Sequence, residues 1–272
     1  MNDRFDVANM VAAVTGGGGA LCGAMARALA EAGAKVAVLD LSLDAAQRVV
    51  SDISEKGGQA IAAEADVLEK SSVETARDTV IEKFGKVDIL INGAGGNKRE
   101  ATTSDDVEFF DLPPDAVRWV FDLNFLGTFL PCQVFGKDMA GSGQGIILNI
   151  SSMNAFRPLT RIPAYSAAKA AISNFTQWLA VHMSKNYSKD IRVNALAPGF
   201  FLTEQNKFLL VDESSGEYTP RGKTIIDHTP MARFGDPDDL VGTVMWLLSP
   251  AAKFVHGVAI PVDGGFSAFS GV

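Results

Sequence analysis

The segment Val11-Ala12-Ala13-Val14-Thr15-Gly16-Gly17-Gly18-Gly19-Ala20-Leu21-Cys22-Gly23 decides the fold class of this chain. Its first five residues form a short apolar run, which predicts a buried strand. Apolar residues then recur at helical spacing from Leu21 to Ala32, and Gly33 follows as a stop signal. Glycines between a strand and a helix let a pyrophosphate approach the backbone, and the helix N-terminus offers free N–H groups. The expected phosphate contacts are Gly16, Gly18, Gly19 and Leu21; the alternative is a tight turn without a ligand.

The same alternation of short apolar runs and helical stretches continues along the chain. The expected strands are 11–15, 35–40, 59–63, 87–92, 145–151, 191–197 and 258–262. Helical patterns cover residues 44–57, 71–85, 115–140 and 164–186. Strands that alternate with helices form βαβ units, so the sequence predicts an α/β protein with a parallel seven-stranded sheet and helices on both faces. We expect one doubly wound Rossmann-type domain over residues 1–272.

The composition argues against several other classes of protein. The chain has 272 residues, of which 47% are hydrophobic and 21% charged, as is typical of a globular domain. Its net charge of −8 speaks against binding to nucleic acid or to an anionic membrane surface. Two cysteines and three scattered histidines show no metal-ligand spacing, so we expect no metal site. No segment resembles a signal peptide or a membrane span, and we expect a cytoplasmic protein.

The end of the second expected strand indicates which nucleotide binds. Asp40 stands 24 residues after Gly16, where a carboxylate can accept hydrogen bonds from ribose hydroxyls and repel a 2′-phosphate. Leu41 follows it, so no cation stands there to neutralise such a phosphate. These two residues predict NAD as the cofactor rather than NADP. The alternative is that Asp40 only caps the next helix.

A candidate catalytic pair lies in the helical pattern 164–186. Tyr165 and Lys169 are four residues apart and therefore share one face of the helix. A nearby ammonium lowers the pKa of a tyrosine, which suits proton transfer to or from a substrate oxygen. Ser152 directly follows the expected strand 145–151, and Asn124 lies in the helical pattern before that strand. These four residues predict a site at the carboxyl ends of the strands.

With its motifs in this order, the chain resembles the classical short-chain dehydrogenase/reductase family from about Ala8 to Phe266. The resemblance implies that Tyr165 is the general acid/base, that Ser152 orients the substrate oxygen, and that Lys169 lowers the tyrosine pKa and holds the nicotinamide ribose. It implies that Asn124 anchors a water in a proton relay, and that the protein is a homotetramer. The further cofactor contacts that it implies are Asp66 and Val67 at the adenine, Asn92, Ala94 and Gly95 at the riboses, and Pro198, Gly199, Phe201 and Thr203 at the carboxamide.

The chain departs from the family's pattern at three positions. Ala20 and Cys22 stand where the family has glycines, and Gly93 stands where it has a second asparagine. A thiol near a helix N-terminus can become a redox switch, because its pKa can fall there. The alternative for Cys22 is a buried and inert thiol.

The substrate class is predicted from polar residues that should border the site. Lys98 and Arg99 follow the fourth expected strand. The expected substrate contacts are Asn97, Asn154, Arg157 and Arg161, since an arginine can hold a carboxylate bidentately. The strings 93–97, 153–161 and 198–206 resemble the sugar-acid members of the family, those that oxidise D-mannonate to D-fructuronate. Alternatives are a gluconate 5-dehydrogenase-like enzyme, a 3-oxoacyl thioester reductase, or a nucleotide sensor without catalysis; for the arginines, the alternative is ion pairing with Asp or Glu.

The longest irregular stretch is residues 204–229, which is polar and rich in Gly and Pro at 212–222. A loop of this length in a compact domain is typical of a lid over the substrate. The alternative is a static excursion or a subunit contact.

Overall fold

The computed structural model describes residues 3–203, 207–212 and 214–271. Within them, seven parallel strands form a sheet in the order β3-β2-β1-β4-β5-β6-β7. The strands are β1 (Val11–Thr15), β2 (Lys35–Asp40), β3 (Gln59–Glu64), β4 (Ile89–Asn92), β5 (Gly145–Ile150), β6 (Ile191–Pro198) and β7 (Ala259–Val262). The predicted doubly wound fold class is confirmed.

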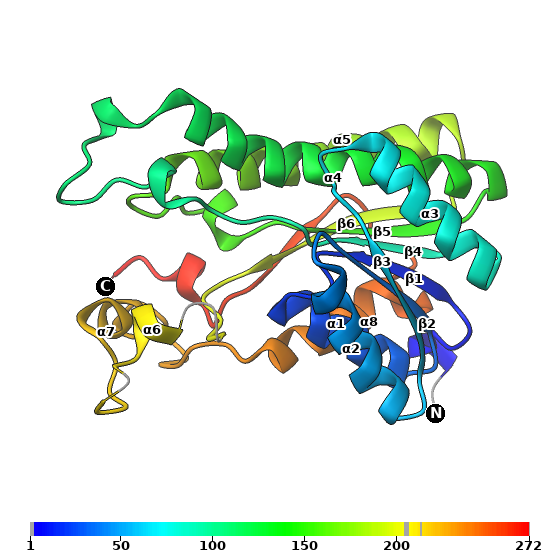
Figure 1. Ribbon diagram of the computed structural model, residues 1–272, viewed down its shortest axis with the longest axis horizontal. Helices are drawn as coiled ribbons and strands as arrows, with labels where there is room; N and C mark the ends of the chain where they lie inside the picture. Colours follow the sequence, from blue (N-terminus) through cyan, green and yellow to red (C-terminus); the bar gives the residue numbers. More distant parts are fainter. Residues whose placement is uncertain (1–2, 204–206, 213, 272) are drawn as a thin grey trace.

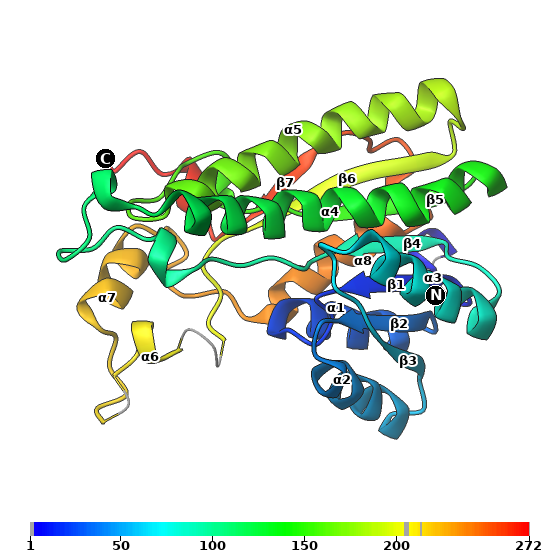
Figure 2. The same cartoon turned by 45° about the horizontal axis from the view of Figure 1, so that its top comes forward.

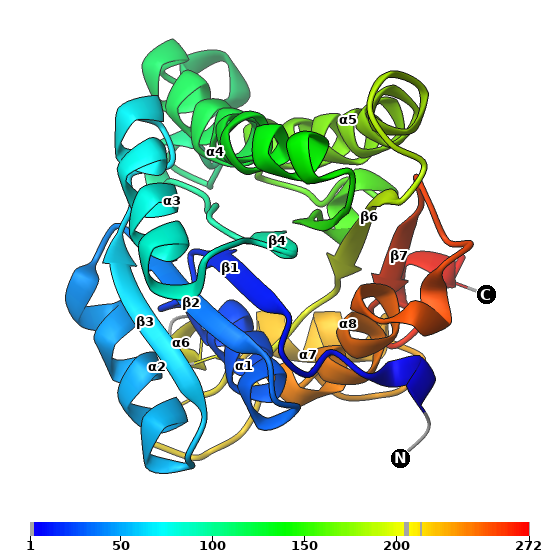
Figure 3. The same cartoon turned by 90° about the vertical axis from the view of Figure 1, so that its right-hand side faces the viewer.

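Helices cover both faces of the sheet (Figure 3). The helices on one face are α1 (Ala20–Glu31), α2 (Leu43–Glu55) and α8 (Val241–Leu248), and those on the other are α3 (Lys70–Phe84), α4 (Pro114–Ser142) and α5 (Pro163–Asn186). In β1, Ala12 and Val14 pack toward α1, while Val11 and Ala13 pack toward the opposite layer. Both faces of the strand are therefore buried, which is why its sequence is continuously apolar.

The element boundaries differ from the predicted ones by at most two residues. β4 begins at Ile89 instead of residue 87, and the Asp88 carboxylate just before it accepts a hydrogen bond of 2.8 Å from the Val11 N–H. α4 runs to Ser142, two residues past the expected end, and stops at Gly143 in the left-handed conformation (φ 75°). A glycine adopts this conformation without the steric cost that other residues meet.

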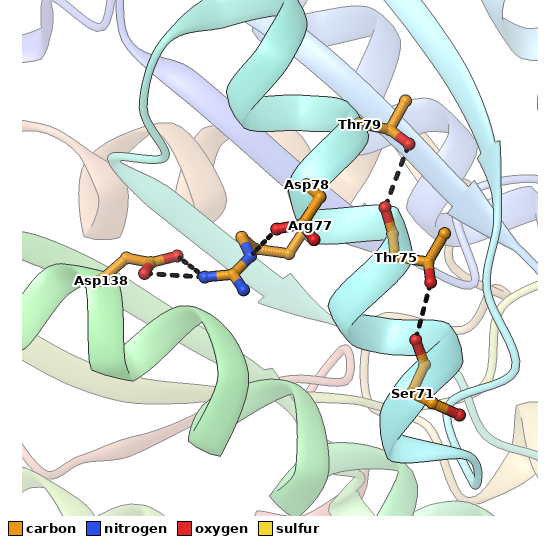
Figure 4. A network of polar contacts seen from close by, with 6 residues as sticks. All are labelled: Ser71, Thr75, Arg77, Asp78, Thr79 and Asp138. Carbon is orange, nitrogen blue, oxygen red and sulfur yellow. Dashed lines mark hydrogen bonds and ion pairs between the residues drawn. The ribbon is translucent and has the colours of Figure 1, made fainter.

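A polar network joins α3 to α4 (Figure 4). The Arg77 guanidinium donates two hydrogen bonds to Asp138, at 2.9 and 3.0 Å, and contacts Asp78 at 2.8 Å. The hydroxyls of Thr75 and Thr79 donate back along α3, to the carbonyls of Ser71 and Thr75. The two hydrogen bonds between Arg77 and Asp138 hold α3 against α4, the helix that carries Asn124.

The segment predicted to be irregular contains two short helices, α6 (Lys207–Leu210) and α7 (Pro220–Asp227). They pack around a small core of Leu210, Ile225 and Phe234. Figures 1 and 2 show both helices at the end of the molecule where the C-terminus lies. Residues 204–206 and 213 of the expected lid lie outside the described part of the chain. In that part, no helix combines the length and apolar character needed to cross a membrane.

Candidate active site

An open groove of about 360 Å³ lies at the carboxyl ends of β1, β2 and β4. The chain leaves β1 toward one face of the sheet and β4 toward the other, so a crevice opens between them. Of the predicted cofactor contacts, the groove is lined by Gly16, Gly19, Leu21, Asp40, Leu41, Asp66, Val67, Ala94 and Gly95. Further lining residues, not predicted as contacts, are Ala20, Cys22, Ala65, Gly93, Leu123 and Ile150. Most of these are chain neighbours of predicted contacts, which is the signal that could have found them.

The floor of the groove is backbone. Gly16 has φ 64°, and a Cβ there would lie only 2.8 Å from the Ala94 nitrogen. α1 begins after Gly19, and no side chain caps its first turn. The free N–H groups and the positive end of the helix dipole are therefore available to an anion. These residues fit the pyrophosphate of a dinucleotide.

Asp40 closes the adenosine end of the groove. One carboxylate oxygen accepts from the Gly18 N–H and the other from the Ser42 N–H, both at 3.0 Å. Asp40 therefore also braces the glycine loop, in addition to its predicted role. Each carboxylate oxygen keeps lone pairs for a ribose hydroxyl. Leu41 is 66% exposed and carries no charge, so the pair fits a nucleotide with a free 2′-hydroxyl.

Tyr165, Lys169 and Ser152 meet beside the groove. The Lys169 Nζ donates a hydrogen bond of 2.8 Å to the Ile150 carbonyl and lies 5.5 Å from the centroid of the Tyr165 ring. Ser152 lies close enough to Tyr165 to lower the pKa of its hydroxyl, which burial raises. Two elements thus supply the three side chains: the end of β5 and the first turns of α5. The arrangement can hand a proton between Tyr165 and a substrate oxygen.

Burial dominates the electrostatics of this cluster. It lowers the pKa of Lys169 to about 8, because the ammonium is removed from water. Burial also raises the pKa of Tyr165, and Ser152 offsets part of that increase. The implied role of Lys169 in lowering the tyrosine pKa stays a prediction. The ammonium lies over the ring of Tyr165 and donates a hydrogen bond to the Ile150 carbonyl.

Asn124 fixes the turn that follows β4. Its Nδ2 donates to the carbonyls of Gly96 (2.7 Å) and Val120 (2.8 Å), and its Oδ1 accepts from the Gly96 N–H at 3.3 Å. Its own carbonyl accepts from the Thr128 hydroxyl at 2.9 Å. The side chain therefore holds Gly95 and Gly96 beside Lys169. Its implied role as a water anchor stays a prediction.

Several predicted cofactor contacts lie outside the groove. The Asn92 side chain is buried and donates to the Asn149 Oδ1 at 2.9 Å and to the Cys132 sulfur at 3.1 Å. Pro198 ends β6, and the Gly199 N–H donates to the Val262 carbonyl at 2.9 Å. Phe201 lines a second hollow of about 220 Å³, and Thr203 lies two residues beyond it.

The predicted substrate contacts do not converge on one point. The Asn97 amide donates to Thr102 at 2.8 Å, and Arg161 pairs with Asp105 at 3.5 Å. Asn154 and Arg161 line a surface hollow along a face of α5 that does not include Tyr165. For Arg161, the ion-pair alternative thus describes the observed contact.

Arg157 contacts a segment that the sequence analysis did not consider. Its Nε donates to the carbonyl of Ser267, at 3.2 Å. Phe266, the neighbour of Ser267, packs edge-to-face on Phe200 after β6. The C-terminal segment therefore joins the loop after Ser152 to the chain after β6. No local pattern could have shown this, because 110 residues separate Arg157 from Ser267.

Comparisons with known proteins identify relatives over nearly the whole chain. Residues 10–213 match the family model of the short chain dehydrogenases. The uncharacterized oxidoreductase UxuB of Bacillus subtilis is 49% identical, with 98% of each chain covered. A solved structure from Haemophilus influenzae, a proposed D-mannonate oxidoreductase with bound NAD, is 48% identical over 98% of each chain, with a TM-score of 0.92.

Two relatives from Escherichia coli carry assigned activities. A 7alpha-hydroxysteroid dehydrogenase is 34% identical, with 97% of this chain and 96% of the relative covered. A 5-keto-D-gluconate 5-reductase is 31% identical, with 97% and 98% covered. The family model and these relatives, together with the Ser152, Tyr165 and Lys169 cluster beside a dinucleotide groove, lead to one conclusion: the chain belongs to the short-chain dehydrogenase family, whose members are nicotinamide-dependent oxidoreductases acting on CH–OH groups.

Proposed function

We propose that this protein is an NAD-dependent oxidoreductase that interconverts a secondary hydroxyl and a ketone on a six-carbon sugar acid, with D-mannonate and D-fructuronate as the pair. The observation that carries the proposal is the 48% identity, over nearly the whole chain, to a proposed D-mannonate oxidoreductase with bound NAD. The uncharged Leu41 beside Asp40 supports NAD over NADP.

The proposed chemistry assigns each side chain a role. The nicotinamide, when bound, accepts or donates the hydride. Tyr165 takes the proton from the substrate hydroxyl in oxidation and returns it to the carbonyl oxygen in reduction. Ser152 orients that oxygen through its hydroxyl and also acts to lower the pKa of Tyr165. Lys169, held by the Ile150 carbonyl, places a positive charge beside the ring at pH values below about 8.

Arg157 is the proposed contact for the substrate carboxylate. Its Nε donates to the Ser267 carbonyl, and the two terminal nitrogens of a guanidinium match the two oxygens of a carboxylate. It stands in the loop that follows Ser152, five residues along. Arg161 instead lies against Asp105. We therefore assign substrate recognition to Arg157 rather than dividing it between the two arginines.

Steady-state kinetics with D-mannonate, D-fructuronate and a matching neutral polyol test this function. Arg157→Ala is expected to raise the KM for the acids about ten- to a hundredfold, the range for a lost hydrogen bond to a charged group. Activity on the neutral polyol should change little. Arg48→Ala, an exposed arginine on α2, is the matched control. Turnover of the neutral polyol at the rate of the acids, or equal losses on both in Arg157→Ala, would contradict the assignment.

A second candidate is the reduction of 5-keto-D-gluconate. The Escherichia coli relative with that activity, 31% identical, favours it. The same assay decides between the two, because both substrates are six-carbon acids with a ketone at C5 and differ in the configuration at C2. A higher kcat/KM for 5-keto-D-gluconate than for D-fructuronate would select the second candidate.

The assembly and the location are further parts of the proposal. We propose a cytoplasmic homotetramer, supported by the exposed apolar side chains of Trp178 (55%) and Val181 (60%) on α5. Light scattering of the purified protein and fractionation of its native cells measure these two properties. A monomer at micromolar concentration would contradict the assembly.

A further inference from the structure

Two of the departures from the family's motif lie against each other. Cys22 stands in the first turn of α1 and Gly93 directly follows β4, 71 residues later. A Cβ placed on Gly93 would overlap the Cys22 sulfur and would lie 3.5 Å from the Cys22 Cβ. The thiol therefore fills the volume that a side chain at position 93 would take.

The backbone of Gly93 does not itself demand a glycine. Its φ is not positive, so an ordinary residue could adopt its conformation. Its N–H donates to the Thr15 carbonyl at 3.2 Å and to the Thr15 hydroxyl at 3.1 Å. Apart from the Cys22 atoms, the nearest neighbour of an added Cβ is that carbonyl, at 3.0 Å, a tight contact that a small shift relieves. The sulfur is thus the principal obstacle to a side chain here.

The turn that begins at Gly93 leads directly to the catalytic cluster. The Ala94 N–H donates to the Thr15 hydroxyl at 3.3 Å, and a Cβ on Gly16 would touch Ala94. A Cβ on Gly95 would lie 2.6 Å from the Asn124 Oδ1 and 3.4 Å from the Lys169 Nζ. The turn therefore packs between the glycine loop on one side and the side chains of Asn124 and Lys169 on the other.

We propose that Cys22 and Gly93 form one complementary pair. The thiol acts as a positioning residue, because its contact with Gly93 determines where the backbone of residues 93–95 lies relative to the bound dinucleotide. This inference rests on the proposed function, because it needs a dinucleotide in this groove. It makes position 22 a determinant of cofactor affinity, acting through the backbone of Gly93 to Gly95. A change at one position is compensated by the matching change at the other.

The thiol acts here by volume and not by redox chemistry. Cys22 is 5% exposed, and burial raises its pKa to about 12, with the charge of Lys169 opposing that increase. A thiolate is therefore absent at neutral pH, and a buried thiol of this kind is inert. The redox-switch interpretation of Cys22 does not fit this environment.

The test is a double-mutant cycle with Gly93→Ala, Cys22→Gly and the double variant. Dissociation constants for NAD+ and NADP+ are measured by calorimetry, and the melting temperature of each ligand-free protein is recorded. Gly93→Ala is expected to weaken dinucleotide binding about tenfold, as overpacking beside the groove displaces the turn. The double variant should recover to within about threefold of the wild type, a coupling typical of residues in contact. Cys132→Gly, which removes the other buried thiol, should give no recovery when combined with Gly93→Ala.

Three results would overturn the pair. The first is a Gly93→Ala variant that binds the dinucleotide as tightly as the wild type. The second is a double variant in which the effects of the two single changes on the dissociation constant simply add. The third is a set of variants whose melting temperatures differ while their dissociation constants stay equal, which indicates a merely structural contact. If Gly93→Ala does not fold, the double variant alone tests the proposal, because the proposal requires this variant to fold and to bind the dinucleotide. A wild-type protein that binds neither nucleotide would instead refute the proposed function itself.

Discussion

The charge on Lys169 should be measurable as a cost to the stability of the ligand-free protein. The side chain is 4% exposed, and burial lowers its pKa from 10.5 to about 8. The unfolded chain therefore binds more protons at this side chain between these two pH values, so the contribution of Lys169 to the free energy of unfolding rises with pH in this window. Below pH 8 the full cost is present, and at pH 7 it amounts to about 3 kcal/mol.

The perturbation is Lys169→Met, which keeps the length of the side chain and removes its charge. From pH 7 to pH 9 the wild type should gain roughly 1 kcal/mol of unfolding free energy that the variant does not gain. Losing the hydrogen bond to the Ile150 carbonyl costs about 1 kcal/mol at both pH values, so it cancels in the comparison. The variant should be inactive.

The assay is urea unfolding of the ligand-free proteins, followed by tryptophan fluorescence, at both pH values. Lys189→Met, on an exposed lysine, controls for the loss of one surface charge and should follow the wild type. An identical change from pH 7 to pH 9 in the wild type and in Lys169→Met would refute the reasoning, because it would mean that Lys169 does not titrate in this window.

Three other outcomes are expected from the site. Tyr165→Phe should abolish turnover while the affinity for NAD stays within a few-fold of the wild type. Ser152→Ala should lose less turnover, within the range of about 10²–10⁴ for general acid/base assistance. Retained turnover in Tyr165→Phe would exclude the tyrosine as the proton donor. Asp40→Ala combined with Leu41→Arg should raise the kcat/KM ratio of NADP over NAD, since the carboxylate that repels a 2′-phosphate is replaced by a cation; a wild type that already prefers NADP would contradict this. If 204–229 is a lid, NAD plus substrate should slow proteolysis at the exposed residues 214–216, and an unchanged cleavage rate would favour a static segment.

The core strands could be predicted from the sequence almost to the residue. β1 and β2 begin and end where the apolar runs do, because both strands are covered on both faces and end at the groove, which is lined by Gly16 just after β1 and by Asp40 at the end of β2. The candidate groove could be predicted for the same reason, since its residues follow directly from strand ends. Such positions depend on local pattern and on the topology of a parallel sheet alone.

The helix α7 was missed although the sequence carries its start signal. Thr219 caps its N-terminus by accepting from the Gly222 N–H at 3.1 Å, and Pro220 occupies the first turn. A threonine followed by proline is a typical helix start. The polar and glycine-rich composition of residues 212–222 is typical of a loop, and this pattern is stronger than the short capping signal.

Contacts between distant segments could not be predicted. Arg157 and Ser267, or Cys22 and Gly93, are linked by no periodicity and no shared motif. The second pair was visible only as two separate departures from a pattern. Their contact depends on how the α1 turn and the end of β4 meet in space, which only the structure defines.

The stability cost of Lys169 also bears on the choice between an enzyme and a nucleotide sensor. An apolar side chain in place of the buried ammonium would make the chain more stable by a few kcal/mol, so a nucleotide sensor would keep Lys169 only for its implied contact with the nicotinamide ribose. The hydrogen bond to the Ile150 carbonyl returns only part of that cost. A buried lysine beside a tyrosine is costly as a scaffold and useful for proton transfer. The energetics of the folded chain are therefore consistent with its membership of an enzyme family, and we expect the cluster to serve proton transfer.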